Sequence, residues 1–140
     1  MSFELSIVTP EGVAFEESAS SVLLPGSEGQ FEVLPGHVRF LTSLVIGEAV
    51  IKTERRGTLY AALSNGFAEV TQDHVVVMVD TCEFASDIDV LRAERARARA
   101  EAALALAKQS AYEDHMFAVE EAALRRAITR LEVAKTGGEH

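Results

Sequence analysis

The sequence predicts a β + α protein: an N-terminal antiparallel β-sandwich of about ten strands over residues 1–85, then a C-terminal antiparallel two-helix hairpin over residues 86–140. Two observations lead to this prediction. Before residue 86, short runs of alternating apolar and polar residues are separated by closely spaced turn residues, as in sandwiches and barrels. After it, alanine, leucine, arginine and glutamate dominate, and all four are strong helix formers.

The expected strands follow one another at short intervals. In the first, Phe3, Leu5 and Ile7 alternate with polar residues, which indicates one buried face. Further apolar runs cover residues 13–15, 21–24, 31–33, 40–45, 48–52, 59–63, 67–70 and 75–79. The last run is apolar at successive positions, so we expect it to be central and buried on both faces.

Two capping signatures predict where the helices begin. Ser86 with Asp89 marks the start of the first, which we expect to run to about residue 108, and Ser110 with Glu113 marks the start of the second. The link is short, so the helices should lie antiparallel, and residues 136–138 should end the second. The residues expected to pack along their shared seam are Leu91, Ala98, Ala102 and Ala105 with Phe117, Leu124, Ile128 and Leu131.

Charge and composition exclude several classes of function. The net charge of −9 divides into −8 over residues 1–86 and −1 over residues 87–140, and an acidic body is unsuited to nucleic acid. No run of about 18 apolar residues occurs, so we expect no direct insertion into a membrane. A single cysteine, Cys82, excludes an internal disulfide and fits a reducing compartment.

No residue pattern indicates catalysis. The cluster at residues 25–29 lacks the lysine of a phosphate-binding loop and contains Glu28, so it is interpreted as a tight turn. His37 has no partner at metal-ligand spacing, so we interpret it as a loop histidine that bonds to backbone. We therefore expect no catalytic residues, no metal and no required cofactor.

The arginines of the helical half offer two interpretations. Asp89, Arg92 and Arg99 share one face of the first helix, and the like-charged pair Arg126 and Arg130 lies four residues apart on the second. The four arginines can converge on a polyanion such as a phosphate chain, because guanidinium groups bind phosphate in a bidentate way. The alternative is a solvated charged face with Asp89 acting only as a cap, and taken alone the residues favour it.

Several motifs together point to a family. They are residues 8–10 with Gly12, Pro25-Gly26-x-x-Gly29, residues 34–37, residues 64–70, and the helix start at residues 88–93. Taken with these motifs, the whole chain resembles the epsilon subunit of bacterial and chloroplast F-type ATP synthases.

The resemblance implies a non-catalytic rotor subunit of the central stalk, in which the sandwich holds the gamma subunit and rests on the ring of c subunits. A ring-facing loop is implied at Gln30, Glu32 and His37. The hairpin is expected either to fold down on the sandwich or to extend into the catalytic alpha/beta head, where it inhibits ATP hydrolysis. The implied location is peripheral, on the cytoplasmic face of the bacterial inner membrane or its stromal equivalent.

Members of the family that sense ATP bind it on the folded-down hairpin, so ATP is expected here as a possible regulatory ligand. The residues of this chain that correspond are Glu83, Asp89, Arg92, Ala93, Arg99, Arg126 and Arg130. With the resemblance, the polyanion interpretation of the arginines becomes the favoured one. Two other hypotheses stay open: a stand-alone ATP-sensing module, and a small nucleotide hydrolase.

Overall fold

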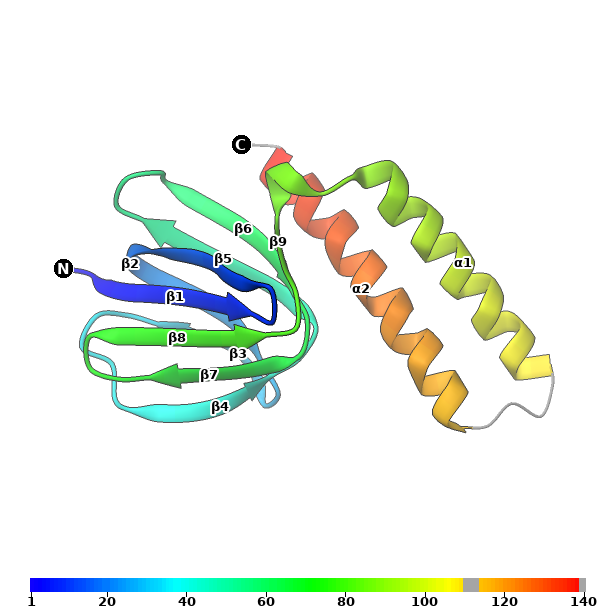
Figure 1. Cartoon of the computed structure of the whole chain (residues 1–140), viewed down its shortest axis with the longest axis horizontal. Helices are drawn as coiled ribbons and strands as arrows, with labels where there is room; N and C mark the ends of the chain where they lie inside the picture. The colour runs from blue at the N-terminus through cyan, green and yellow to red at the C-terminus, as the bar shows by residue number, and fades with distance from the viewer. Residues whose placement is uncertain (110–113, 139–140) are drawn as a thin grey trace.

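The computed structural model describes residues 1–109 and 114–138, which form a strand-rich body followed by two long helices (Figure 1). The strands, in chain order, are β1 (Phe3–Thr9), β2 (Gly12–Gly26), β3 (Gly29–Val33), β4 (Phe40–Leu44), β5 (Gly47–Thr53), β6 (Thr58–Leu63), β7 (Gly66–Val70), β8 (His74–Val79) and β9 (Cys82–Phe84). A 3-10 turn, η1 (Ala85–Asp87), leads to α1 (Val90–Gln109) and α2 (Asp114–Gly138). The predicted fold class is confirmed.

The sheet closes on itself through the long strand β2. Its order is β1-β8-β7-β4-β2-β5-β6-β9, with β3 on β2, and the additional pairing of β1 with β2 joins the two layers of the sandwich. The sequence predicted two strands at residues 13–15 and 21–24. They form one strand of 15 residues, because Phe15 and Ala19 bridge the polar stretch between them with buried side chains.

Two further differences concern pairing. The sandwich is not wholly antiparallel, because β1 runs parallel to β8 in the register Glu4↔His74 to Val8↔Met78. Strand β9 was not predicted, since its three residues are too few to show an alternation. It pairs with the edge of β6, Ala62 opposite Glu83, and so carries the chain from the sandwich to the hairpin.

The core lies between the two layers and is built almost wholly from the sandwich. Its largest fully buried side chains include Leu5, Ile7, Leu24 and Ile51. Strand β8 lies between β1 and β7, as expected of a central strand, but it is not buried on both faces. Val75, Val77 and Val79 point into the core while Met78 is 45% exposed, because none of the described helices and strands covers the outer face of β8.

The first helix begins later than predicted. Ser86 lies in η1 and Ile88 is extended, so the helix starts at Val90. Asp89 is the residue that caps it, because the backbone N–H of Arg92 donates to Asp89 Oδ1 at 3.1 Å. The capping pair predicted for the second helix, Ser110 with Glu113, lies outside the described residues. The second helix ends at Gly138, within the predicted residues 136–138.

The seam between the helices differs from the predicted one. On α1 the buried residues are Ala93 and Ala100, whereas the predicted residues Leu91, Ala98, Ala102 and Ala105 are exposed. Helix α1 carries two apolar stripes, and only the one that includes Ala93 packs against α2. Figure 1 shows why α2 differs: it lies between α1 and the sheet, so it buries two sides. Its four predicted seam residues are half-buried, and Ala127 and Val133 are fully buried.

Candidate functional site

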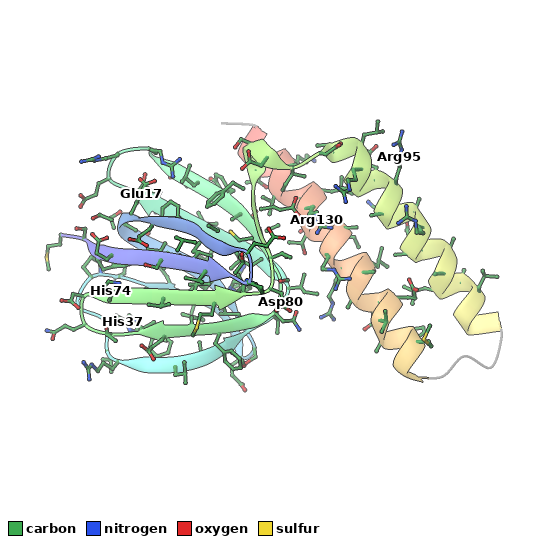
Figure 2. All side chains as sticks on the ribbon, in the orientation of Figure 1. Glu17, His37, His74, Asp80, Arg95 and Arg130 are labelled. Atoms are coloured by element: carbon green, nitrogen blue, oxygen red, sulfur yellow. The ribbon has the colours of Figure 1, made fainter. Side chains whose placement is uncertain are left out.

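The candidate site lies where α2 passes over the C-terminal end of β6, at Ala62 and Leu63, and over Glu83 of the neighbouring strand β9. Arg130 points from α2 toward the sheet (Figure 2), and its Nε–H donates to Glu83 Oε1 at 2.5 Å. The two side chains are 28% and 36% exposed, so this ion pair is partly shielded from water. The pair ties β9 to α2.

A small hollow adjoins this ion pair. It is lined by Ala62, Leu63, Thr81, Glu83, Arg126, Thr129 and Arg130, and its volume is about 10 Å³. That volume suits a single water molecule and is far below that of a nucleotide. In the described part of the chain no carboxylate lies within 4.0 Å of the half-buried Arg126 guanidinium, so its positive charge is available at the hollow.

The other predicted ATP-binding residues take different positions. Asp89 caps α1, and Ala93 is 3% exposed in the seam with α2. Arg92 and Arg99 are exposed on α1, whose main contacts are with α2. The structure therefore brings Glu83, Arg126 and Arg130 together at one hollow, with Arg92 and Arg99 on the neighbouring helix.

The contact between the hairpin and the sheet was not predicted. Its buried apolar residues are Ala62, Ile88 and Val133, with Tyr60, Ala85 and Ala134 packed against them. Gly137 permits a close approach, because a Cβ built there would lie 2.2 Å from the Cβ of Ala85. No local pattern marks these residues, since they become neighbours only when α2 packs on β6.

Carboxylates also meet at this contact. Burial, and secondarily the nearby Glu132 carboxylate, raise the pKa of Glu48 on β5 above its ordinary value. A third group at the same end of the sheet is Cys82. Burial, together with the negative charge of Glu83, raises the pKa of its thiol to about 12, so it stays protonated and unreactive near neutral pH.

The predicted ring-facing residues lie on β3 and in the loop that follows it. Gln30 and Glu32 are exposed on β3. Figure 2 shows His37 at the end of the sheet away from the helices. His37 Nδ1 lies 3.1 Å from the carbonyl oxygen of Val38, and its ring packs on Phe40 at 5.2 Å. The expectation that His37 bonds to backbone is confirmed.

A second surface lies on the outer face of strands β1, β8, β7 and β4. Val8, Met78 and Phe67 stand opposite one another in the strand register, and Val76 and Leu41 lie in the next row with Glu69 between them. Phe67 is 54% exposed and Leu41 65% exposed. We call these five apolar residues the outer apolar face. Exposed apolar patches of this kind are typical of protein interfaces.

In residues 1–109 and 114–138, no three His, Cys, Asp or Glu side chains are grouped so that they could hold a metal ion. No helix within those ranges is both long enough and apolar enough to cross a bilayer.

Comparison with known proteins places both halves of the chain in one family. Residues 2–85 match the ATP synthase delta/epsilon chain beta-sandwich domain, and residues 86–135 match the ATP synthase delta/epsilon chain long alpha-helix domain. The ATP synthase epsilon chains of Trichlorobacter lovleyi and Geobacter sulfurreducens are each 44% identical over 131 residues, covering 94% of this chain and 92% of theirs.

A solved structure agrees in fold. A chain of the Euglena gracilis mitochondrial ATP synthase, in a structure of its OSCP, F1 and c-ring parts, superposes with a TM-score of 0.79 at 20% identity. The superposition covers 96% of this chain and 81% of that chain. At this identity the likeness concerns the fold alone. Because the two family matches together span most of the sequence, the chain belongs to the ATP synthase delta/epsilon chain family.

Proposed function

We propose that this chain is the epsilon subunit of an F-type ATP synthase and works as a non-catalytic part of the rotor's central stalk. The observation that carries the proposal is the end-to-end similarity to bacterial ATP synthase epsilon chains, which includes both the sandwich and the hairpin. In this role the chain couples the catalytic head to the ring of c subunits, on the face of the membrane that bears the catalytic head.

The sandwich is the part that we assign to the gamma subunit and the c ring. The outer apolar face supports the contact with gamma, because Phe67, Met78 and Leu41 gain most from being covered by a partner. The surface of β3 and the following loop, with Gln30, Glu32 and His37, is assigned to the ring. The exposed side chains of Gln30 and Glu32 suit a polar contact with the ring's surface.

The experiment is recovery of the chain with gamma when the synthase subunits are co-expressed. We expect one chain for each gamma, and loss of that recovery in Phe67→Glu, which places a charge on the outer apolar face. The matched control is Val119→Glu on α2, where a similarly exposed apolar residue lies far from this face. A Phe67→Glu chain that is recovered as well as the control would refute the assignment of the face.

The hairpin is the part that we assign to regulation, with ATP as its ligand. The proposed binding residues are Glu83, Asp89, Arg92, Ala93, Arg99, Arg126 and Arg130. The arrangement of Arg126 and Arg130 at one hollow supports this, since Glu83 pairs with Arg130 and, in the described part of the chain, no carboxylate lies within 4.0 Å of Arg126, whose charge is left for an anion. The hollow is too small for a nucleotide, so ATP cannot be enclosed there without movement of the side chains that line it.

Calorimetric titration of the full chain with ATP tests the site. We expect binding that is weakened by Arg126→Ala and by Arg92→Ala, with Arg97→Ala as a control, because Arg97 pairs instead with Glu101 on the same helix. Equal affinity in all four proteins would remove the ATP site and leave the stalk role intact. The same samples test the hydrolase hypothesis, because a nucleotide hydrolase turns ATP over. The co-expression experiment tests the stand-alone sensor, which would fail to be recovered with the synthase.

A further inference from the structure

The hairpin is held on the sandwich by a narrow strip along α2. Helix α1 has its main contacts with α2, while α2 contacts β6, β5, β9 and η1. The fully packed apolar side chains of this strip are Ala62, Ile88 and Val133, and one of the three is alanine. Because apolar stabilisation scales with buried area, so small a strip holds the hairpin weakly.

Charges flank the strip on both sides and act in opposite senses. On the β9 side, Arg130 and Glu83 attract each other through their ion pair. On the β5 side stand two carboxylates. Glu48 lies opposite Ala62 in the β5–β6 register, and Glu132 precedes Val133, which packs on Ala62. In residues 1–109 and 114–138, no cation lies within 4.0 Å of either carboxylate.

Other charged side chains stand around Glu48 on the neighbouring elements. On its own face of β5 the nearest is Lys52, four residues along the strand. Strand β2 presents Leu23 and Pro25 on that face, neither of which titrates. The remaining titratable or charged side chains on the elements that meet near Glu48 are Tyr60 on β6, Glu32 on β3, Glu83 on β9 across Ala62 from Glu48, and, on the part of α2 nearest the sheet, Arg125, Arg126, Arg130 and Lys135.

We propose that Glu48 and Glu132 form a repulsive pair that keeps the docked hairpin close to release, so that docking of α2 onto the sheet tightens on acidification. The pair is a regulatory element separate from the anion-binding arginines. This repulsion sets how readily α2 separates from the sheet.

The direction of the pH effect follows from the state of Glu48. In the docked chain, burial and Glu132 raise its pKa above the ordinary value of 4.5, and the contribution of Glu132 is lost when α2 leaves. Protonation of Glu48 therefore favours the docked state. Its contribution is fully present below the ordinary pKa and is lost as pH rises through the raised pKa.

The docked fraction can be measured by energy transfer in the isolated full-length chain. Dyes on Gln72→Cys in the sandwich and Ala98→Cys on α1 report the separation, with Cys82→Ala removing the native thiol. Both labelled positions are exposed. A range from about pH 4 to pH 8 brackets the titration of a glutamate whose pKa is raised.

Neutral variants isolate the pair. Glu48→Gln and Glu132→Gln should each raise the docked-to-undocked ratio at neutral pH by about two- to five-fold, the range typical of partly exposed charge pairs. In the double variant the free energy of docking should change by less than the sum of the two single changes, because either substitution alone removes the repulsion. Glu94→Gln on α1, an exposed carboxylate away from the strip, is the matched control and should change nothing.

The decisive comparison is between the wild-type chain and Glu48→Gln at each pH. The ion pair of Glu83 with Arg130 adds its own acid dependence to both proteins, so only their difference reports the proposed pair. We expect that difference to vanish at acidic pH and to grow toward neutral pH. A difference that does not depend on pH, or additive effects in the double variant, would overturn the proposal.

If the wild-type chain is too fully docked to measure, the same set is compared in the Arg130→Gln background, where loss of the ion pair shifts docking into a measurable range. The experiment needs no other subunit and no nucleotide. Its failure is therefore distinguishable from failure of the proposed place in the synthase.

Discussion

Substitution Gly137→Ala tests how the hairpin is held on the sandwich. A Cβ at this position would lie 2.2 Å from the Cβ of Ala85, whereas two carbons pack at about 3.5 Å, so the end of α2 must move by about 1.3 Å. Overpacking of this kind costs about 1–3 kcal/mol. Burial of Val133, the largest apolar side chain of the strip that is fully buried, stabilises the docked state by about 1.5–3 kcal/mol.

These two energies are of the same size, so Gly137→Ala should undock a large fraction of the hairpin. The substitution also has an opposite local effect. Alanine is a better helix former than glycine by about 1 kcal/mol, so α2 itself should not unfold. We therefore expect faster amide hydrogen exchange along the sheet-facing side of α2 with unchanged helix content by circular dichroism.

The control restores the space on the other side of the contact. Ala85→Gly removes the carbon that the new Cβ would meet, so the double variant Ala85→Gly with Gly137→Ala should regain protection from exchange. Wild-type exchange rates in Gly137→Ala alone would refute the reasoning. So would a double variant that stays as unprotected as the single one.

Two further predictions concern the helix start and the thiol. Asp89→Ala should lower the stability of the hairpin by about 1 kcal/mol, because it removes the acceptor of the Arg92 N–H. The measurement is the melting temperature of the helical circular dichroism signal, which should fall. The control is Asp87→Ala, which should leave the melting temperature unchanged because Asp87 lies before the cap in η1. The thiol of Cys82, whose pKa is raised to about 12, should react with iodoacetamide near pH 8 far more slowly in the folded chain than in denaturant. Equal folded and unfolded rates would contradict the burial of the thiol.

The fold could be predicted from the sequence because its signals are local. Alternation around Phe3, Leu5 and Ile7 marks a half-buried strand wherever that strand ends up in the sheet. The same local logic failed for residues 75–79. A run of successive apolar residues indicates burial on two faces, but one of those faces here is the outer apolar face, which a single chain leaves open.

The helix seam could not be predicted, because α1 has two apolar stripes that satisfy the same spacing. Ala93 and Ala100 face α2, and Ala98 and Ala105 do not, although both pairs are seven residues apart. The choice depends on how each helix is turned about its own axis. An offset of one residue in the sequence turns a helix by about 100°.

The candidate site was predicted in part. The arginine spacing and the family resemblance pointed to Glu83, Arg126 and Arg130, which do line one hollow. Nothing in the sequence pointed to Glu48, Glu132 or Gly137. Their roles arise from the packing of α2 on β5, β6 and η1, a long-range contact that leaves no periodic signal.

The central claim is a division of labour between a sandwich that joins the rotor and a hairpin that regulates it. The most direct measurement compares ATP hydrolysis by synthase that holds the full chain with hydrolysis by synthase that holds residues 1–86 alone, a part whose core is complete without the helices. We predict that the shortened chain is incorporated at the same stoichiometry and that hydrolysis rises. Loss of the shortened chain from the complex, or unchanged hydrolysis with full incorporation, would contradict the account.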